Sequence, residues 1–531
     1  MPLEKKPVKI IVILLACVIF LLFAFPNSRA SENPAMLAVF EPDEAVQLPV
    51  VLRMLTPKAD AFLTIKKFLA YEYYFYGFPF FGSSALVVLP FKLGGAIDNT
   101  PLVMLSLRQL ISVLPMLIAL LLMTYMQDGF SSWRSVALFL FLVLVPAVLK
   151  NGFWWHPDGL VLLLAVLVIF FLWRDENRFG LSFYLASVAA GILTATKLVG
   201  VFFFLAVLVS LIWGYKSRRL TLAGVVRHGV FFILVMVLSF VIANPFLLSE
   251  WARPDYFSKL LGQNAVLSQG YGIQYAKGLK AFIEQFQPSY GLVITLFLAV
   301  AGNVNGLFNP KTRRLHLLIL AWTLPISVYL ISSVHFKFQY WLPVILPLYS
   351  GLCTLLPETT PQGGKFNFNR WMQIIISVFL LAQFVFFGIS AVKAFETRAR
   401  RAEANPLILA FDRIQQRLDL INKDELMIYH DVRLYMPPHS GWQYEATTDL
   451  LSYDWIRARN FDVLVLMQQR LDDYLHSGAV GVDPDGFAKS QLFYKDANVG
   501  LLEDYYLLDR DTTALIFVTE QICESQPGLC P

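Results

Sequence analysis

The chain contains 531 residues, of which 57% are hydrophobic and only 15% are charged. A mean hydropathy of +0.58 excludes an ordinary soluble protein, because so apolar a chain must be solvated by lipid. The net charge of +5 lies largely in short loops, where Lys and Arg set membrane orientation, so it gives no indication of a nucleic-acid partner.

Apolar segments recur along the chain. Several approach the ~20 residues that a bilayer-spanning helix needs, among them residues 10–25, 102–125 and 230–248. The first follows a lysine-rich start, as in a signal peptide, but its apolar run is long and no clear small-residue cleavage site follows. We therefore predict a polytopic, all-α membrane domain that keeps its first helix.

One topology places the strongly basic short loops on one side of the membrane. It requires a cytoplasmic N-terminus and no crossing at residues 78–94. That segment is short and rich in Gly, Pro and aromatic residues, so we expect it, together with the Lys66–Lys67 stretch, to form amphipathic helices along the outer interface. The result is about eleven spans. The cytoplasmic basic loops are then Arg134, 174–178, 215–219, 311–314 and 365–370.

Beyond Ala391 the charge density rises and the pattern becomes that of a water-soluble domain. An amphipathic helix pattern at residues 407–420 precedes short apolar runs typical of strands. We therefore expect a transmembrane domain over residues 1–392 and a small extracytoplasmic α/β domain over residues 393–531. The strand-like runs are residues 426–429, 461–467 and 514–518.

The four cysteines fall into two kinds. Cys17 and Cys353 lie in apolar spans, where a thiol usually just packs. Cys523 and Cys530 close a short loop near the C-terminus and could form a disulfide if that end lies in an oxidising compartment.

Glu41, Asp43 and Glu44 follow the first span, on the outer side in this topology. A carboxylate there can act as the general base that deprotonates an acceptor hydroxyl, with a neighbour that orients it or holds a divalent metal ion. The alternative is structural: a solvated loop, or an N-cap by Asp43 for a helix that starts near Ala45.

A second group, Trp-Trp-His-Pro-Asp at residues 154–158, precedes the fourth span. Its aromatic residues can simply anchor the membrane interface, and Asp158 can cap the helix that follows. In this topology Asp158 lies on the same membrane face as the first acidic group. A capping role alone would not require that.

Basic residues on the outer side form a third group. Lys197 lies at a sharp turn between two spans and Lys337 precedes a late span, where a lysine at membrane depth usually has an anionic partner. A substrate that carries phosphate would explain this departure from the positive-inside trend, because clustered cations neutralise a leaving phosphate. The alternative is snorkelling to lipid headgroups. Further basic residues in or beside the first outer loop are Arg53, Lys66, Lys67 and Arg108.

A general base and a phosphate-binding group are the parts that inverting glycosyl transfer needs, with the base on the face opposite the leaving group. No glycine-rich phosphate loop and no dinucleotide-binding motif is evident, so a lipid-linked donor is favoured over a nucleotide sugar.

In their order and facing, these motifs resemble those of the GT-C superfamily of membrane glycosyltransferases, in particular the branch of protein O-mannosyltransferases and the lipid A aminoarabinose transferase. The resemblance covers residues 8–390. Its motifs are Pro42-Asp43-Glu44, an aromatic amphipathic stretch before Arg108, His156-Pro157-Asp158-Gly159, Thr196-Lys197 and Tyr340-Trp341-Leu342-Pro343.

The resemblance implies a GT-C-like catalytic domain in the cytoplasmic membrane of a prokaryote, a polyprenyl-phosphate sugar donor, catalysis outside the cytoplasm and inversion at the anomeric carbon. Asp43 resembles the catalytic acidic residue of the first loop, with Glu44 as its neighbour, and Asp158 resembles the second acidic site. Many relatives have Arg where this chain has Gln339, and Lys337 is the candidate to substitute for it. The donor-phosphate candidates are Lys197, Lys337, Lys67 and Arg108, and the further substrate-binding candidates are His156 and Tyr340.

Two other classes of membrane protein stay open. A secondary transporter would also have many spans, but no internal repeat or matching pair of broken helices is evident, and the charges gather at one face and not at the midplane. A sugar-polymer ligase or polymerase would typically carry one very large late outer loop. The sugar is not assigned, and the acceptor can be a glycolipid, a polysaccharide or a protein. The C-terminal domain can bind the acceptor or cover the site; its candidate carbohydrate contacts are Arg433, Tyr435, Trp442 and Tyr444.

Overall fold

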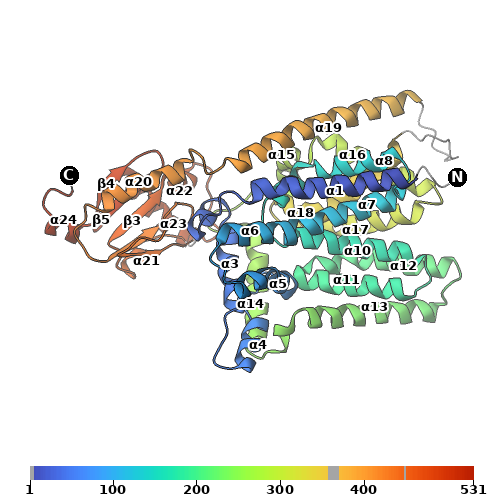
Figure 1. Cartoon of the computed structure of the whole chain (residues 1–531), viewed down its shortest axis with the longest axis horizontal. Helices are drawn as coiled ribbons and strands as arrows, with labels where there is room; N and C mark the ends of the chain where they lie inside the picture. The colour runs from blue at the N-terminus through green and yellow to red at the C-terminus, as the bar shows by residue number, and fades with distance from the viewer. Residues whose placement is uncertain (1–4, 357–369, 448–449, 531) are drawn as a thin grey trace. The chain divides into compact units, whose positions relative to one another are not determined.

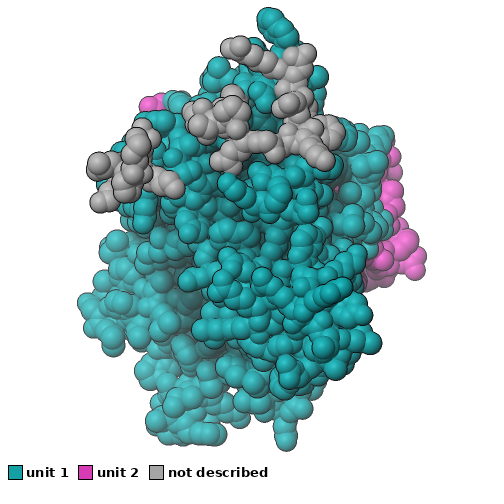
Figure 2. All heavy atoms as spheres, turned by 90° about the vertical axis from the view of Figure 1, so that its right-hand side faces the viewer, with its two compact units in different colours: residues 1–28, 50–263, 277–399 teal, residues 29–49, 264–276, 400–531 magenta. Residues whose placement is uncertain are grey.

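The computed structural model describes residues 5–356, 370–447 and 450–530. The chain divides into two compact units, coloured teal and magenta in Figure 2. The first unit contains residues 1–28, 50–263 and 277–399. The second contains residues 29–49, 264–276 and 400–531, so two segments of the N-terminal three quarters belong to it.

Helices account for nearly all the regular structure before residue 400 (Figure 1). In the first half they are α1 (Lys5–Asn27), α2 (Pro34–Phe40), α3 (Pro42–Met54), α4 (Ala61–Leu69), α5 (Phe78–Leu93), α6 (Thr100–Leu107), the π-helical η1 (Arg108–Val113), α7 (Leu114–Asp128), α8 (Trp133–Val143), α9 (Pro146–Gly152), α10 (Asp158–Asp175), α11 (Leu181–Thr196), the 3₁₀ turn η2 (Leu198–Phe203) and α12 (Phe204–Lys216). They continue with α13 (Leu222–Ala243), η3 (Pro245–Leu248), α14 (Ala252–Gln269), α15 (Gly278–Tyr290), α16 (Val293–Phe308), α17 (Arg313–Ser333), α18 (Phe338–Ser350), η4 (Gly351–Leu355) and α19 (Arg370–Ala399).

The described residues include six helices that are long and apolar enough to cross a membrane, or up to eight if each of two bent pairs is one span. The bent pairs are α8 with α9, at 64°, and α15 with α16, at 88°. Helices α5 and α11 are apolar but shorter. The polytopic all-α membrane domain is confirmed, and the number of about eleven spans stays a prediction.

The centre of the first unit is α10, which packs against α7, α11, α17 and α18. Its Leu- and Val-rich sequence is apolar around most of its circumference, as expected for a helix surrounded by other helices. The first residue of this buried helix is Asp158, a charged group that needs partners within the unit.

The chain around Lys197 forms a tight turn between two helices. Helix α11 ends at Thr196, Lys197 is extended (φ −149°, ψ 144°), and the tight turn η2 leads into α12. A Cβ atom at Gly200 would lie 2.3 Å from Thr194 Oγ1 and 2.4 Å from the Ala190 carbonyl oxygen. Glycine at position 200 therefore allows η2 to pack directly against the end of α11.

The second unit contains the predicted α/β domain, a five-stranded sheet in the order β2-β1-β3-β5-β4. Strand β1 is parallel to β2 and β3, whereas β5 is antiparallel to β3 and β4. The strands are β1 (Leu426–His430), β2 (Trp442–Glu445), β3 (Val463–Met467), β4 (Tyr505–Arg510) and β5 (Ala514–Thr519), and the helices are α20 (Pro406–Leu418), α21 (Tyr453–Arg457), α22 (Gln468–Leu475), α23 (Pro484–Val499) and α24 (Glu520–Ser525). The predicted runs at 426–429, 461–467 and 514–518 are β1, β3 and β5.

Both faces of the sheet are covered. Alternate residues of a strand point to opposite faces, so Val463 and Val465 join one hydrophobic core with α20, and Leu464 and Leu466 join another with α22 and α23. Cys523, in α24, and Cys530, beyond its end, form a disulfide.

Candidate active site

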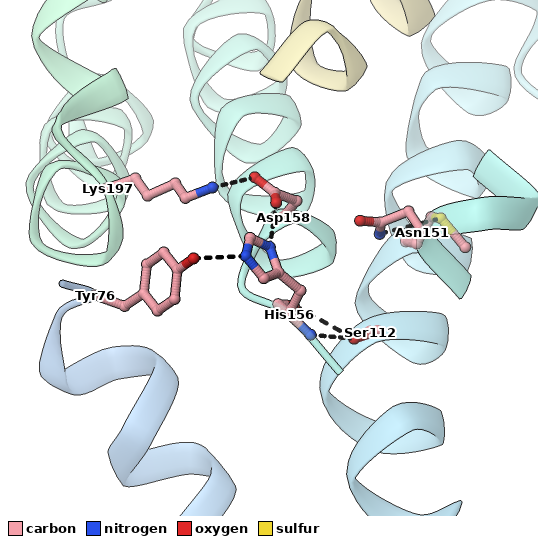
Figure 3. Close-up of polar contacts among 7 residues, drawn as sticks. Tyr76, Ser112, Asn151, His156, Asp158 and Lys197 are labelled. Carbon is pink, nitrogen blue, oxygen red and sulfur yellow. Dashed lines mark hydrogen bonds and ion pairs between the residues drawn. The ribbon is translucent and has the colours of Figure 1, made fainter. Parts of the chain in front are cut away.

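Asp158 is the centre of a buried polar chain in the first unit (Figure 3). One carboxylate oxygen, Oδ1, lies 2.6 Å from Lys197 Nζ. The other, Oδ2, is ion-paired with His156 Nδ1, and His156 Nε2 lies 2.7 Å from the Tyr76 hydroxyl. The His156 and Asp158 residues are each only 1% exposed. The two carboxylate oxygens thus connect a cation on one side to an imidazole and a phenol on the other.

The sequence around Asp158 fixes this orientation. Pro157 is the N-cap residue of α10, so Asp158 lies in the first turn, where the helix dipole favours negative charge. The carboxylate contacts His156 and Lys197, and the N-cap residue is Pro157. Asp158 is therefore not simply a helix cap. A Cβ atom at Gly159 would lie 2.5 Å from the Ser112 carbonyl oxygen, so glycine lets α10 and η1 approach closely.

The backbone and ring of His156 are also held. Its N–H donates to Ser112 Oγ (3.2 Å), and the Ser112 hydroxyl can donate to the His156 carbonyl oxygen (3.3 Å). The Trp154 ring stacks on the imidazole, with ring centroids 4.0 Å apart. Because backbone, ring face and both nitrogens are engaged, His156 is a pre-positioned group.

Lys197 and Lys337 converge on one aromatic ring. Lys197 Nζ lies 4.6 Å from the centre of the Tyr340 ring and 5.4 Å from that of Tyr76. Lys337 Nζ lies 5.8 Å from the centre of the Tyr340 ring. Both are within cation–π range. Four of the expected donor or substrate residues, Lys197, Lys337, His156 and Tyr340, therefore belong to one cluster with Asp158.

Two other expected phosphate-binding residues have structural contacts of their own. Lys67 Nζ lies 2.5 Å from a carboxylate oxygen of Glu72. The Arg108 side chain is fully buried and donates to the Asn27 carbonyl oxygen at 2.8 Å. These contacts link α4 to the next turn and α1 to η1, which gives both residues a role in packing.

The acidic residues that follow α1, Glu41, Asp43 and Glu44, belong to the second unit. Helix α3 begins at Pro42 and not near Ala45, and the N–H groups of Glu44 and Ala45 donate to the Glu41 carbonyl oxygen. The expectation that Asp43 is an N-cap at Ala45 is therefore wrong: Asp43 lies within the first turn. Its side chain is exposed, whereas Glu44 is fully buried.

Glu41, the third acid of this group, is paired within the same unit. Arg401 Nη1 lies 3.0 Å from Glu41 Oε1, and its guanidinium carbon lies 4.4 Å from the centre of the Phe40 ring. Among the described residues no group of three or more His, Cys, Asp or Glu side chains is placed to hold a metal ion.

The candidate carbohydrate contacts of the C-terminal domain separate in the structure. Trp442 and Tyr444 pack against the hydrophobic core under α20, and the Tyr435 hydroxyl accepts from Asn33 Nδ2 at 3.0 Å. Arg433 alone of the four is exposed.

Tyr76 and Ser112 were not expected from the sequence. Tyr76 lies in an aromatic stretch, Tyr-Glu-Tyr-Tyr-Phe-Tyr-Gly-Phe. Gly77 is the one residue of this stretch that could have indicated a close backbone contact next to Tyr76. Gly77 N–H donates to the Thr196 carbonyl oxygen (3.2 Å), and a Cβ atom on Gly77 would lie 1.6 Å from the Ala195 carbonyl oxygen. This close approach places Tyr76 beside the end of α11 and hence beside Lys197.

The chain is similar over its whole length to solved membrane proteins. It superposes on ArnT from Cupriavidus metallidurans bound to undecaprenyl phosphate with a TM-score of 0.53 and 13% identity, covering 98% of this chain and 99% of that one. The apo form of that ArnT gives a TM-score of 0.52, at 13% identity and 98% coverage of each chain. The chain has the fold of the GT-C superfamily.

A third match with the GT-C fold is the oligosaccharyltransferase AglB from Archaeoglobus fulgidus, in complex with an inhibitory peptide and a dolichol-phosphate. It has a TM-score of 0.50 at 12% identity, covering 89% of this chain and 71% of that one. No family model and no curated protein matches the sequence. In this GT-C fold, three of the motifs that carried the resemblance, 156–159, 196–197 and 340–343, meet around Asp158.

Proposed function

We propose that this protein is an integral-membrane glycosyltransferase that moves a sugar from a polyprenyl-phosphate carrier to an acceptor at the outer face of the membrane. The observation that carries the proposal is the convergence of Lys197 and Lys337 over Tyr340, beside Asp158, in a chain with the GT-C fold. The matched ArnT and AglB structures hold undecaprenyl phosphate and a dolichol-phosphate, which supports a lipid phosphate as the donor here.

The two lysines would bind the donor phosphate. When the bond between the anomeric carbon and the phosphate oxygen breaks, its electron pair goes to the phosphate, so negative charge increases there. Pre-positioned cations stabilise such a developing charge. Asp158 already fixes the Lys197 amino group, so little ordering entropy is lost when the phosphate binds.

Asp43 would act as the general base. It takes the proton of the acceptor hydroxyl as that oxygen forms its bond to the anomeric carbon, on the face opposite the departing phosphate, and the configuration inverts. An exposed carboxylate in a helix first turn is accessible to an acceptor, whereas buried Glu44 is suited to holding the helix in place.

The orientation follows from two features of the chain. The basic short loops favour a cytoplasmic N-terminus, and disulfides persist in oxidising compartments. The Cys523–Cys530 disulfide therefore supports an extracytoplasmic second unit. The cytoplasmic membrane of a prokaryote, as the location of the first unit, is a further part of the proposal.

The test is glycosyl transfer in membranes supplied with a panel of radiolabelled polyprenyl-phosphate sugars and endogenous acceptors. Wild type, Asp43→Asn and the control Glu32→Gln, an exposed acid of the same segment, are compared at matched protein levels. We expect one donor to be consumed by wild type and the control, and Asp43→Asn to be slower by a factor of ~100 or more, about 3 kcal/mol of transition-state stabilisation. Absence of turnover for every donor contradicts the transferase, and full activity of Asp43→Asn contradicts the assigned base.

A further inference from the structure

The segment 264–276 carries two tyrosines on a firmly attached tip of the second unit. Gln274 N–H donates to the Val480 carbonyl oxygen (2.7 Å), and Val482 N–H donates to the Gly272 carbonyl oxygen (3.1 Å). Ile273 packs against the core formed with α22 and α23. Segment 264–276 is thus held to the α/β domain by backbone hydrogen bonds and by the partly buried Ile273 side chain.

The turn that presents the tyrosines depends on a glycine. Gly270 has φ +118°, and a Cβ atom there would lie 2.2 Å from the Ile273 carbonyl oxygen. Such a conformation is readily accessible only to glycine. It brings Tyr271 and Tyr275 together, with ring centroids 6.4 Å apart and ring planes at 74°.

Both rings remain substantially open to solvent, with 58% of Tyr271 and 47% of Tyr275 exposed. Tyrosine combines a large apolar face with a hydrogen-bonding hydroxyl. Aromatic faces with a few placed polar groups are the usual lining of sites for small ligands. Two such rings on a fixed tip match the apolar C–H faces and hydroxyl groups of a sugar.

Asp43 and Arg433 each act electrostatically on one of the two rings. Partial burial of the ring, followed by the Asp43 carboxylate, raises the pKa of Tyr271. The pKa of Tyr275 is raised by burial and by Tyr271, whereas the Arg433 guanidinium lowers it. Charges act in this way only over short distances. Asp43 therefore lies near Tyr271, and Arg433 lies near Tyr275.

We infer that Tyr271, Tyr275 and Arg433 form the acceptor-binding site, and that the acceptor is a glycan whose terminal sugar is uncharged. The inference rests on the proposed function, because it makes Asp43 the base beside this site. The rings would stack on the sugar and Arg433 would donate to its hydroxyl oxygens. Asp473 interacts electrostatically with Arg433 and with Tyr275, and Asp43 interacts with Tyr271. The Arg433 cation near the rings is therefore accompanied by two carboxylates, so a phosphorylated or carboxylated sugar gains no net attraction here.

The experiment measures ligand binding directly, without turnover. The full-length protein in lipid nanodiscs is examined by saturation-transfer NMR with three probes: neutral methyl hexosides, a hexose phosphate and a serine-containing peptide. We expect the hexosides to bind wild type, and Tyr271→Ala and Tyr275→Ala to weaken binding at least tenfold. Tyr506→Ala, which removes a tyrosine of β4 that is 45% exposed, serves as the matched control and should bind as wild type does.

Three further variants separate the possible causes of failure. Tyr271→Phe and Tyr275→Phe keep the stacking face and should retain most of the binding, while unchanged amide exchange of residues 480–482 in the alanine variants would show that the tip is still attached. Asp43→Asn should bind hexosides as wild type does although its turnover is slower by a factor of ~100 or more, so binding with little catalysis separates the acceptor site from the assigned base. Preference for the hexose phosphate or the peptide, or normal hexoside binding by both alanine variants, would overturn the inference.

Discussion

Lys197 Nζ and Asp158 Oδ1 lie 2.6 Å apart, with side-chain exposures of only 11% and 2%. The lysine follows the last residue of α11 and the aspartate starts α10. A lysine at membrane depth is costly without an anion, and Asp158 supplies one. The ion pair therefore holds two helix ends together as well as fixing the proposed phosphate-binding amino group.

Removing one partner of this pair should destabilise the protein more than removing both. Lys197→Met leaves the Asp158 carboxylate buried beside His156 and should cost about 3–5 kcal/mol, as for other broken buried ion pairs. Adding Asp158→Asn should recover part of that loss. Apparent unfolding midpoints of wild type, both single variants and the double variant form a double-mutant cycle; strictly additive effects would show that the pair is not coupled.

Gly77→Ala should prevent correct packing of the segment that carries Tyr76. The added methyl group would lie 1.6 Å from the backbone oxygen of Ala195, which no side-chain rearrangement can relieve. We expect a large loss of folded protein, measured by size-exclusion chromatography in detergent. The control is Gly388→Ala in α19, where no atom lies within 4 Å of the new methyl group; an equal loss there would point to a general sensitivity of the helices.

The β1 strand should become less stable at mildly acidic pH because of His430, at its C-terminal end. Burial lowers the pKa of His430, against the opposing effect of Asp431. The unfolded chain binds a proton near pH ~6.5 and the folded strand binds it only at lower pH. The stability contributed by neutral His430 is therefore complete above pH ~6.5 and decreases as the pH falls below it.

Hydrogen exchange of β1 peptides at pH 7.5 and 5.5, corrected for intrinsic rates, measures this effect. Protection should be lower at pH 5.5 in wild type. His430→Gln should show a smaller difference, and the same difference in both proteins would assign the pH dependence to another group.

The disulfide gives a direct test of orientation. In a Cys17→Ser/Cys353→Ser background, a membrane-impermeant maleimide applied to intact cells (spheroplasts, if an outer membrane is present) should label Cys523 and Cys530 only after treatment with an impermeant reductant. Labelling that requires cell lysis would place the second unit in the cytoplasm, contrary to the proposed topology.

Sequence patterns predicted the parts of this fold that depend on local properties. The strands β1 and β5 begin at the predicted residues, Leu426 and Ala514. In both, an apolar run bounded by polar turns determines where the strand forms and that its side chains are buried. The membrane domain followed from hydropathy in the same way. The number of spans is harder to predict, because composition does not distinguish short or bent apolar helices, such as α5 and α9, from helices that cross the membrane.

The site required information that no local pattern contains. The sequence indicated that Lys197 needs an anion but not that Asp158, 39 residues earlier, provides it. Tyr76 was missed because its position depends on the contact of Gly77 with α11. The adjacency of Asp43 and Glu44 suggested a joint role, yet consecutive residues of a helix point in different directions, and one is exposed while the other is buried.

The composition of the second unit has a consequence for protein engineering. A recombinant fragment cut at residue 400 would contain the whole β-sheet but would lack residues 29–49 and 264–276, which belong to the same unit. Such a fragment would lose Ile273, which packs against its core, and would lose Gln274 and Gly272, the backbone hydrogen-bond partners of Val480 and Val482. Grafting the 264–276 tip onto the fragment through a short linker is therefore the sounder way to obtain a soluble form for crystallisation or ligand screening.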